Sequence, residues 1–380
     1  MKPLYYQNNF TLGILGGGQL GRMLVQSGID LNISFSVLDP DANAPCSQLA
    51  PFQTGKLTDY DTVMRFGEAC DLITIEIENV DTRALFELEK MGKKVFPQPA
   101  IIELIQDKRT QKQFYIDNDI PTAGFVLVEN KNDVMAHRSF LPAVNKLGKE
   151  GYDGRGVQML RKAADLDKAF DAPGLLEKLI PFDKEIAVIV AQNEKGDIAS
   201  YPAVEMEFHP KKNLVEYLFA PARLDEAIRQ KADQIARKVI RRLGMVGILA
   251  VEMFVGPEGQ VLVNEVAPRP HNSGHHTIEA NETSQYEQHL RAILNQPLGS
   301  TQLRSPCIMV NLLGEEGYTG EAKYKGMEDV LALEGAHVHL YGKRVTKPFR
   351  KMGHVTIVDS DMESLRKKAY FVKDNLKVIA

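Results

Sequence analysis

Residues 248–267, ILAVEMFVGPEGQVLVNEVA, constrain the fold more than any other part of the chain. Two apolar runs flank the sequence GPEG at 256–259, which is typical of the turn of a β-hairpin. If the hairpin folds about the Glu258–Gly259 bond, Glu252 lies directly opposite Glu265 on one face of the sheet. Two opposed carboxylates repel each other, and their apolar neighbours leave that repulsion poorly screened.

A bound divalent cation is the economical explanation for this pair of glutamates. Mg²⁺ prefers oxygen ligands and is usually held by one or two carboxylates together with substrate phosphates. We therefore predict that Glu252 and Glu265 bind Mg²⁺, with Mn²⁺ as a substitute. The alternative is a hairpin that merely tolerates two exposed glutamates.

The bulk composition excludes several classes of protein. A net charge of −4 and a pI near 6.2 argue against a protein that coats nucleic acid or an anionic membrane. No apolar run approaches the ~18 residues of a membrane span, and the opening sequence MKPLYYQNNF lacks the apolar core of a signal peptide. The three cysteines are far apart, which fits a reduced compartment. We expect a cytoplasmic protein that binds neither nucleic acid nor membrane.

The order of predicted elements indicates three units in this chain of 380 residues. Strands at 10–15, 33–38, 72–77 and 94–96 alternate with helical stretches, which predicts a parallel α/β sheet. From about residue 300 the pattern changes to short strands, with a final helix near 362–375. The expected units are 1–108, 109–300 with a flap subdomain at about 120–182, and a small, mostly β unit at 301–380.

The first glycine cluster, GGGQLG at 16–21, follows a strand and matches the G-x-G-x-x-G fingerprint of dinucleotide-binding proteins. Asp39 stands at about the right distance, so this motif alone favours an NAD-dependent dehydrogenase. The signal is weak, because any anionic ligand at a helix N-terminus can use the same backbone amides. Gln19 and Arg22 suggest a ligand with polar groups, and a plain strand–helix turn is the other alternative.

The second glycine cluster, GYDGRG at 151–156, follows a strand that ends in Lys146. It is not a P-loop, because Gly-Lys-Ser/Thr occurs nowhere in the chain. Gly154 and Gly156 would let the loop close over phosphates through backbone N–H groups, and Lys146 could reach the same phosphates as a point charge. A hairpin turn without function is the alternative.

Three further segments are candidate binding elements. The sequence Glu177-Lys178-Leu179-Ile180 could present its backbone to a purine while Glu185 takes ribose hydroxyls, although a plain strand fits equally well. The loop APRPHNSGHH at 267–276 could suggest zinc, but its two prolines and lack of cysteine favour a substrate clamp, in which Arg269 stabilises a transferring phosphoryl group. The basic residues at 343–354 are a candidate phosphate site or simply a solvated face.

Together these pieces resemble the ATP-grasp superfamily. Within it, GGGQLGRM at 16–23, EIENV at 76–80, GYDGRG at 151–156, NEVAPRPHNSGH at 264–275 and RKMGH at 350–354 are similar to the 5-(carboxyamino)imidazole ribonucleotide synthetase family of purine biosynthesis. The resemblance implies an α/β ATP-grasp fold with an N-terminal Rossmann-like parallel domain and a small, mostly β C-terminal domain. It also implies ATP-dependent carboxylation of 5-aminoimidazole ribonucleotide with bicarbonate, through carboxyphosphate, and a homodimer.

The resemblance assigns roles to individual residues. It implies that ATP contacts Lys108, Lys146, Gly151, Tyr152, Asp153, Gly154, Arg155, Gly156, Val157, Glu177, Lys178, Leu179, Ile180, Glu185, His209, Asn264 and Glu265. It places around the ribonucleotide Gln19, Glu76, Tyr152, His271, Asn272, Ser273, His275, Lys343, Arg350 and Lys351. Catalytic roles fall to Asp153, Arg155, Lys146 and Arg269, and the metal to Glu252 and Glu265.

Two features depart from the pattern of related enzymes. Many ATP-grasp enzymes have Asn two residues after the second metal glutamate, where this chain has Ala267, and Lys149-Glu150 stands where relatives often have small residues. Two other functions stay open. One is a related ATP-grasp carboxylase or formyl-phosphate ligase acting on another purine intermediate. The other is the dehydrogenase, which leaves Glu252 and Glu265 unexplained.

Overall fold

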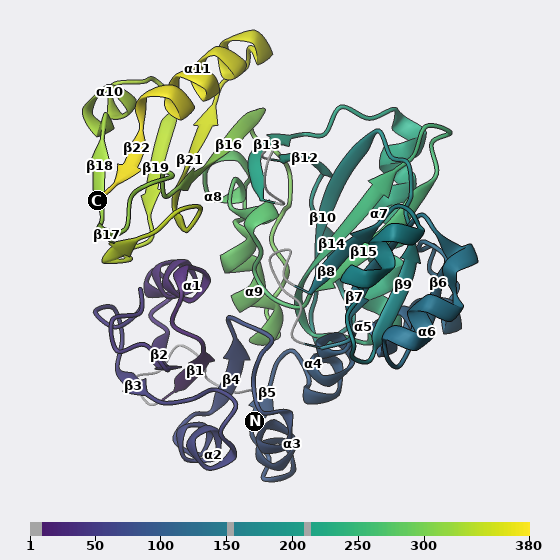
Figure 1. The fold of residues 1–380 in the computed structure, drawn as a ribbon. Coiled ribbons are helices and arrows are strands. Elements are labelled where there is room, and N and C mark those ends of the chain that lie inside the picture. Colours follow the sequence, from purple (N-terminus) through teal and green to yellow (C-terminus); the bar gives the residue numbers. More distant parts are fainter. Residues whose placement is uncertain (1–9, 150–155, 209–213) are drawn as a thin grey trace.

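The computed structural model describes residues 10–149, 156–208 and 214–380 (Figure 1). Within these residues the strands form sheets of five, nine and four strands and two small two-stranded sheets. The five-stranded sheet belongs to the N-terminal part of the chain, and the other two large sheets belong to the rest.

The N-terminal sheet is parallel, with the order β3-β2-β1-β4-β5, as the alternation of strands and helices predicts. Its strands β1 and β4 are almost fully buried and apolar, as expected for strands covered on both faces. Aspartates accept backbone N–H groups at the start of two of its helices, at Asp59 and Asp81. The elements are β1 (Thr11–Leu15), α1 (Gln19–Ile29), β2 (Ser34–Asp39), β3 (Phe52–Thr54), α2 (Tyr60–Glu68), β4 (Leu72–Ile75), α3 (Thr82–Lys90), β5 (Lys94–Val95) and α4 (Pro99–Gln106).

Helix α9 (Gln285–Ile293) joins this sheet to the rest of the molecule. Its residues Tyr286 and Leu290 belong to the same buried cluster as Leu12 and Leu24 of the N-terminal sheet and α1. His289 forms a buried hydrogen bond of 2.9 Å between Nε2 and the Thr74 hydroxyl of β4. The N-terminal sheet therefore shares its core with a helix that lies more than 180 residues further along the chain.

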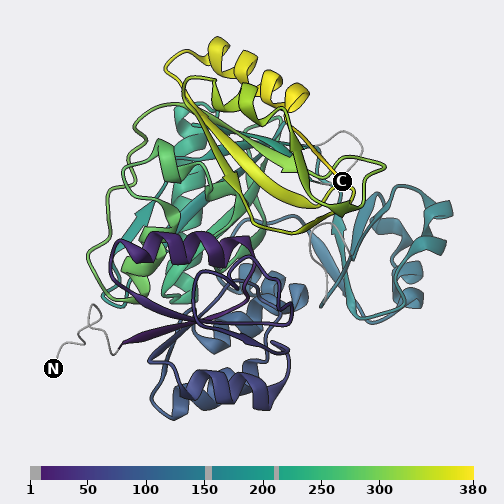
Figure 2. The ribbon, with the colours of Figure 1, turned by 90° about the vertical axis from the view of Figure 1, so that its left-hand side faces the viewer.

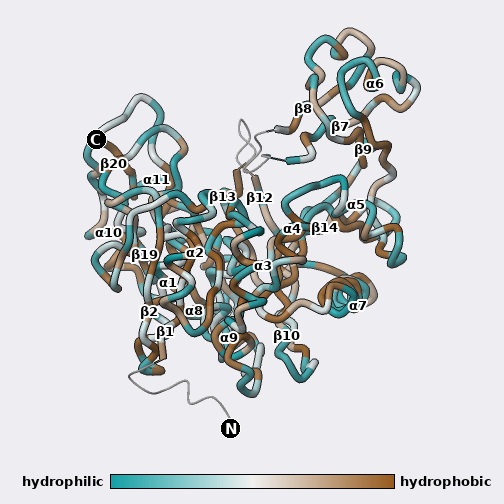
Figure 3. Tube along the Cα trace, turned by 90° about the horizontal axis from the view of Figure 1, so that it is seen from below, coloured by the Kyte–Doolittle hydropathy of each residue, from teal (hydrophilic) through white to brown (hydrophobic). Residues whose placement is uncertain are grey.

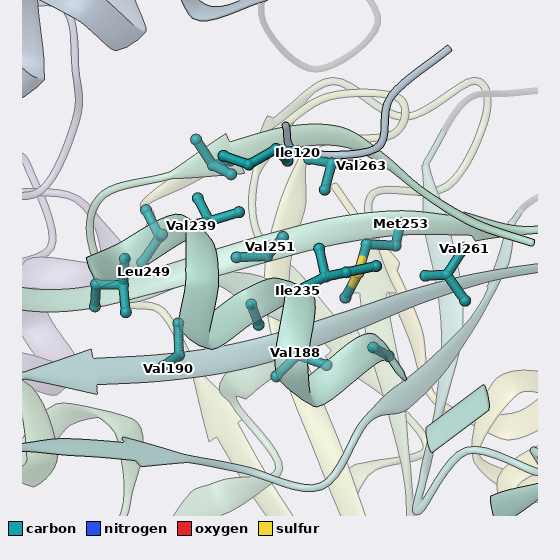
Figure 4. Packing of buried hydrophobic residues seen from close by; sticks show 14 of the residues in the cluster. Ile120, Val188, Val190, Ile235, Val239, Leu249, Val251, Met253, Val261 and Val263 are labelled. Atoms are coloured by element: carbon teal, nitrogen blue, oxygen red, sulfur yellow. The ribbon is translucent and has the colours of Figure 1, made fainter. Parts of the chain in front are cut away.

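The central sheet has the strand order β15-β14-β10-β12-β13-β16-β21-β19, with β11 paired to β10. Helix α7 (Glu226–Leu243) covers one face and buries Ile235 and Val239 against Val251 and Met253 (Figure 4). The helix ends at Gly244, whose φ of +61° suits glycine. The first strands of this sheet are β10 (Lys184–Gln192), β11 (Ile198–Ser200), β12 (Val204–Phe208), β13 (Val215–Ala220), β14 (Gly247–Val255) and β15 (Val261–Ala267).

A smaller lobe holds the antiparallel sheet β6-β9-β7-β8 and stands apart from the other two large sheets (Figure 3). Helix α5 (Lys108–Asp117) leads into it. Its own elements are β6 (Phe125–Val128), α6 (Lys131–Ala136), a 3-10 helix (Arg138–Phe140), β7 (Ala143–Leu147), β8 (Val157–Leu160), a second 3-10 helix (Ala163–Lys168) and β9 (Gly174–Lys178).

The C-terminal strands do not form a large sheet of their own. Strand β16 pairs with β13, so that β16, β21 and β19 extend the central sheet, while α11 packs over them and they lie close to α1 (Figure 2). This pairing is non-local, and the sequence gives no sign of it. The remaining elements are a 3-10 helix (Asn272–Gly274), α8 (Thr277–Ala280), β16 (Cys307–Leu313), β17 (Gly320–Glu321), β18 (Lys323–Lys325), α10 (Met327–Leu331), β19 (Ala336–Leu340), β20 (Val345–Thr346), β21 (Lys351–Val358), α11 (Met362–Asn375) and β22 (Lys377–Ile379).

None of the helices in the described part of the chain combines the length and apolar character needed to span a membrane.

Candidate active site

The hairpin β14–β15 places Glu252 opposite Glu265, as the sequence predicts, but it reaches this register by a different route. Val255 pairs with Val261, so the turn is centred on Glu258 and not on the Glu258–Gly259 bond. That register alone would set Glu252 opposite Asn264. A β-bulge between the Met253 and Glu252 pairs takes up Asn264 as an extra residue and so brings Glu265 opposite Glu252.

Three carboxylates share this face of the sheet, because Glu185 on β10 is paired with Phe254, two residues after Glu252. Burial, together with the charges of Glu265 and Glu185, raises the pKa of Glu252 well above its ordinary value, and Lys351 and Arg269 only partly offset this. Burial and the charge of Glu265 raise the pKa of Glu185 to about 7. Glu252 and Glu265, which face each other across the hairpin, supply hard oxygen donors of the kind that binds Mg²⁺ together with substrate phosphates.

Two lysines that the sequence predicts to hold ATP lie beside the carboxylates. Lys108 Nζ is 3.6 Å from Glu265 Oε2. Lys146 Nζ donates to Asn264 Oδ1 at 3.1 Å and is 3.2 Å from Glu177 Oε1. The bulge residue Asn264 therefore links the lobe that carries Lys146 to the hairpin that carries the carboxylates.

The carboxylate of Glu177 is engaged within the protein, so that any contact with a nucleotide would come from its backbone. It lies between Lys146 and Lys112, at 2.7 Å from Lys112 Nζ, and only 3% of its side chain is exposed. Burial acts to raise its pKa, but the ammonium groups of Lys146 and Lys112 hold that pKa below its ordinary value. Lys112 is not predictable as a buried residue from the sequence, because the helix KRTQKQFYID that contains it is polar on most of its faces.

The rest of the predicted adenine segment is extended, as expected, up to the end of β9 at Lys178. The Lys178 ammonium donates to the carbonyl of Phe140 at 2.8 Å and lies over the Phe140 ring, so this side chain is held within the small lobe. Phe182, just beyond Ile180, stacks on Phe254 with ring centroids 4.6 Å apart. This stack joins the segment to the face that carries the carboxylates.

The first glycine cluster uses its acidic neighbours to hold its own backbone. The Gly17 N–H donates to Asp39 Oδ2 at 2.6 Å, and the Leu20 N–H donates to Glu76 Oε1 at 3.1 Å. A Cβ atom at Gly18 would lie 2.3 Å from Glu76 Oε1, so a larger residue there would displace the Glu76 carboxylate. Both oxygens of Asp39 thus accept backbone N–H groups of nearby loops, a structural role that explains this residue without a bound dinucleotide.

Glu76 closes the other end of the site, next to Gln19 at the start of α1. Burial raises the pKa of Glu76 to about 7, although the charges of Arg269 and Lys343 act in the opposite direction. Residues from the N-terminal sheet, from the loop after the hairpin and from the C-terminal strands therefore act on one another electrostatically.

The loop that follows the hairpin connects these two ends. Arg269 Nε is 2.9 Å from Glu78 Oε1, a partner that the sequence analysis did not identify. His271 Nε2 is 3.6 Å from Glu252 Oε1, while its Nδ1 is 2.9 Å from the Ser273 hydroxyl. Burial and the charges of Arg269 and Lys351 lower the pKa of His271 well below its ordinary value, so its imidazole is neutral.

His275 and Asn272 are buried, with 1% and 9% of their surfaces exposed. His275 Nδ1 is 2.9 Å from the Tyr286 hydroxyl, and its ring stacks on that of His354 with centroids 4.7 Å apart. Among the described residues, the buried Oδ1 atom of Asn272 has no hydrogen-bond partner. Among the residues that the structure describes, no group of three or more His, Cys, Asp or Glu side chains is arranged to hold a metal ion, so nothing favours zinc in this loop.

Of the basic residues in the C-terminal part, Lys343 acts electrostatically on Glu76, and Lys351 acts on Glu252 and His271. Lys343 Nζ donates to the Lys351 carbonyl at 2.7 Å, and Arg350 donates to the Val345 carbonyl at 2.5 Å. Lys351 influences the pKa values of both Glu252 and His271, which places its charge close to the hairpin.

Part of the predicted site lies outside the described residues. These are Gly151, Tyr152, Asp153, Gly154 and Arg155 of the flap, and His209. Gly156 is described and has a φ of +72°, which suits glycine, and Val157 begins β8.

Comparisons with known families cover most of the chain. Residues 10–106 match the ribonucleotide synthetase preATP-grasp domain, residues 113–286 the ATP-grasp domain, and residues 307–368 the phosphoribosylaminoimidazole carboxylase C-terminal domain. The last match agrees with the resemblance of the C-terminal sequence to the 5-(carboxyamino)imidazole ribonucleotide synthetase family.

Two curated relatives illustrate the similarity of sequence. The N5-carboxyaminoimidazole ribonucleotide synthase of Bacillus subtilis is 38% identical over 92% of this chain and 91% of its own length. The phosphoribosylaminoimidazole carboxylase of Ogataea methanolica is 40% identical over 96% of this chain, which spans 69% of that longer protein.

Solved structures give the same result for the fold. The N5-carboxyaminoimidazole ribonucleotide synthetase of Thermotoga maritima is 43% identical, with a TM-score of 0.90 over 98% of this chain and 99% of that one. Two structures from Aspergillus clavatus, one with ATP and one with ADP and 5-aminoimidazole ribonucleotide, are 35% and 34% identical, with TM-scores of 0.88 and 0.87 over 97% of this chain and 98% of theirs. The ATP-grasp fold predicted from the sequence is therefore confirmed.

Proposed function

The chain belongs to the N5-carboxyaminoimidazole ribonucleotide synthase family of the ATP-grasp superfamily, and from this we propose how its residues perform that reaction. The enzyme converts ATP, bicarbonate and 5-aminoimidazole ribonucleotide to N5-carboxyaminoimidazole ribonucleotide, ADP and phosphate in purine biosynthesis. The observation that best supports our assignment of residues is the position of Glu252, which faces Glu265 on one side and His271 on the other.

The nucleotide occupies the face of the hairpin between the two lobes. Lys108 and Lys146 neutralise its phosphates, since both ammonium groups lie next to Glu265 or Asn264. Glu252 and Glu265 would hold Mg²⁺, which would supply positive charge to offset that of the phosphates. Glu185, partly buried on the same face, takes the ribose hydroxyls.

Bicarbonate is a poor electrophile, and its phosphorylation yields carboxyphosphate, which carries a good leaving group. This species hydrolyses readily, so the site must exclude water while it exists. We assign this role to the flap at 151–156. The amine of the ribonucleotide then attacks the activated carbon, and Asp153 orients the amine or accepts its proton.

The ribonucleotide occupies the other end, where Glu76, Arg269, Lys343 and Lys351 meet. His271 is neutral there and can hydrogen-bond without adding charge. Arg269, held by Glu78, lies between the two substrate regions and stabilises the charge on the transferring phosphoryl group.

The substrate assignment is tested by following ADP release with a panel of purine intermediates. Release is expected only when ATP, bicarbonate and 5-aminoimidazole ribonucleotide are all present. Equal release with another amine or with a formyl donor would favour a related carboxylase or ligase. In a parallel melting experiment ATP with Mg²⁺ should raise the melting temperature, whereas NADH should leave it unchanged.

We propose a homodimer in the cytoplasm, by analogy with the family. Sedimentation equilibrium tests the assembly, and a single species of 42.4 kDa at micromolar concentration would contradict it.

Asp153→Ala is expected to bind ATP normally and to lose carboxylation. The reason is that Asp153 acts on the amine and not on the phosphates. Calorimetric titration with ADP and steady-state ADP release check this prediction. If the nucleotide dissociation constant rises as much as the rate falls, the flap is only a nucleotide clamp.

Arg350→Ala is expected to weaken binding of the ribonucleotide about 10- to 150-fold, because a charge-assisted hydrogen bond to its 5′-phosphate is lost. The KM for ATP should change by less than about twofold. Kinetics in which each substrate is varied in turn provide the measurement. Arg304→Ala, which removes the same charge from an exposed position elsewhere in the chain, is the matched control. A KM for the ribonucleotide within twofold of that of wild type would show that the basic residues at 343–354 are solvated surface charges and not a phosphate site.

A further inference from the structure

Lys112 is a buried lysine that the proposed reaction does not use. Only 3% of its side chain is exposed, and its ammonium group is 2.7 Å from Glu177 Oε2. It also donates to the Thr122 hydroxyl at 2.5 Å. A buried ammonium group is expensive unless it is paired and hydrogen-bonded, and Lys112 satisfies both conditions.

The partners of Lys112 form a closed ring of contacts beside the carboxylate hairpin. In one direction Glu177 contacts Lys146, which donates to Asn264 Oδ1 at 3.1 Å. In the other direction the Thr122 hydroxyl donates to the carbonyl of Val263 at 2.8 Å. Because Val263 and Asn264 are neighbours on β15, the ring joins α5, β9 and β7 to the carboxylate hairpin.

The charges in this ring determine the net positive charge that a phosphate beside Lys146 experiences. Lys112 and Lys146 contribute one positive charge each and Glu177 one negative charge, so the trio carries a net charge of +1. Without Lys112, the carboxylate would neutralise Lys146 and the net charge would be zero. At the short distances and low polarity of this site, that difference acts strongly on a nearby phosphate.

We propose that Lys112 is a positioning residue that serves as the counter-ion of Glu177, so that the charge of Lys146 stays available to the phosphates of the nucleotide. The proposal rests on the nucleotide site assigned above, but it does not depend on which amine is carboxylated. Lys112 itself makes no contact with substrate, since it lies behind Glu177 and is almost fully buried.

Three variants distinguish an effect of the Lys112 charge on nucleotide binding from a merely structural effect of its side chain. Lys112→Met removes the charge but keeps an unbranched side chain, and the trio becomes neutral. Lys112→Met combined with Glu177→Gln restores a net charge of +1, carried by Lys146 alone. Glu177→Gln alone removes the negative charge but also lowers the pKa of Lys112 further, so the net charge of this variant depends on the pH.

We would measure the dissociation constant of ADP with Mg²⁺ by calorimetric titration, at a temperature well below the melting point of every variant. Lys112→Met should weaken ADP binding about 10- to 100-fold, in the range of a lost charge-assisted interaction. The double variant should recover to within about threefold of wild type. Lys368→Met is the matched control, because it breaks a 2.8 Å pair with Asp359 in a part of the protein that the reaction does not use.

A double variant that binds ADP no better than Lys112→Met would overturn the proposal, because a structural role predicts that the two losses add. If wild type binds ADP but never shows release of ADP that depends on 5-aminoimidazole ribonucleotide, the proposed function fails while the account of Lys112 stands. The two ideas can therefore be rejected independently.

The pH dependence of wild type gives a second measurement, should Lys112→Met fail to fold. Burial lowers the pKa of Lys112 to about 8; Lys146 acts in the same direction, whereas Glu177 and Glu265 oppose the change. The Tyr115 ring and the Thr122 hydroxyl, which also face the ammonium group, stay uncharged there. Affinity for ADP should therefore fall as the pH rises through about 8, and the double variant should lack this fall. An affinity of wild type that stays level between pH 7 and 9 would contradict the proposal.

Discussion

Replacing Glu252 or Glu265 by Gln is expected to reduce turnover by about 100-fold or more while leaving the fold intact. The two carboxylates face each other across the hairpin. An ion held between them would stabilise the negative charge of the transition state and so lower the activation free energy by several kcal/mol. Glutamine keeps the shape of the side chain but is a far weaker ligand for Mg²⁺.

The same substitutions should stabilise the protein in the absence of metal. Two unit charges about 5 Å apart repel by roughly 3 kcal/mol at an effective dielectric constant of about 20, which is an upper limit for the gain. Because the folded state raises the pKa of Glu252, the charged form is the one that folding penalises. The gain from Glu252→Gln should therefore be absent below about pH 4.5, the ordinary pKa, and should grow as the pH rises.

Turnover and melting temperature, each with and without Mg²⁺, provide the measurement. Glu258→Gln is the matched control, because Glu258 is exposed at the turn of the same hairpin and should change neither quantity. Activity like that of wild type in Glu265→Gln would refute the metal assignment.

Local patterns in the sequence predicted the elements of the fold well. The parallel N-terminal sheet and the hairpin follow from periodicity and from turn residues, which act over short distances in the chain. The opposition of Glu252 and Glu265 was also predicted, although the bulge at Asn264 was not. The turn lies one half-residue step from its predicted centre, which moves the pairing by one residue, and the one-residue bulge moves it back. Glu252 and Glu265 therefore face each other as predicted.

Contacts between distant parts of the chain could not be predicted in this way. The pairing of β13 with β16, the burial of α9 under the N-terminal sheet and the ion pair between Arg269 and Glu78 all join segments that no local pattern connects. Lys112 was missed for a related reason. A lysine on a polar helix is normally exposed, and only the approach of Glu177 from β9 makes a buried ammonium group favourable at this position.

Glu177→Gln should lower the free energy of unfolding by about 3–5 kcal/mol, the range for breaking a buried ion pair by removing one partner. The carboxylate is 97% buried between two ammonium groups, at 2.7 Å from Lys112 and 3.2 Å from Lys146. Without it, no other carboxylate among the described residues forms an ion pair with either ammonium group.

The matched control is Glu205→Gln, which removes one partner of the pair with Lys184. That pair has the same separation of 2.7 Å, but 29% and 17% of its side chains are exposed. Water can solvate the remaining lysine, so the loss should be below about 1 kcal/mol. Urea unfolding of both variants beside wild type compares the two losses directly.

The pH dependence of the loss of unfolding free energy in Glu177→Gln identifies the cause of that loss. Lys112 already has a pKa lowered to about 8 in wild type, mainly by burial, and removing the Glu177 charge lowers it further. A lysine with a lowered pKa destabilises the folded state while the pH is low enough to keep it charged, and this penalty disappears as it loses its proton. The deficit of Glu177→Gln should therefore be larger at pH 6 than at pH 9. A deficit that is equal at both pH values, or no larger than that of Glu205→Gln, would show that the buried charges are not what Glu177 balances.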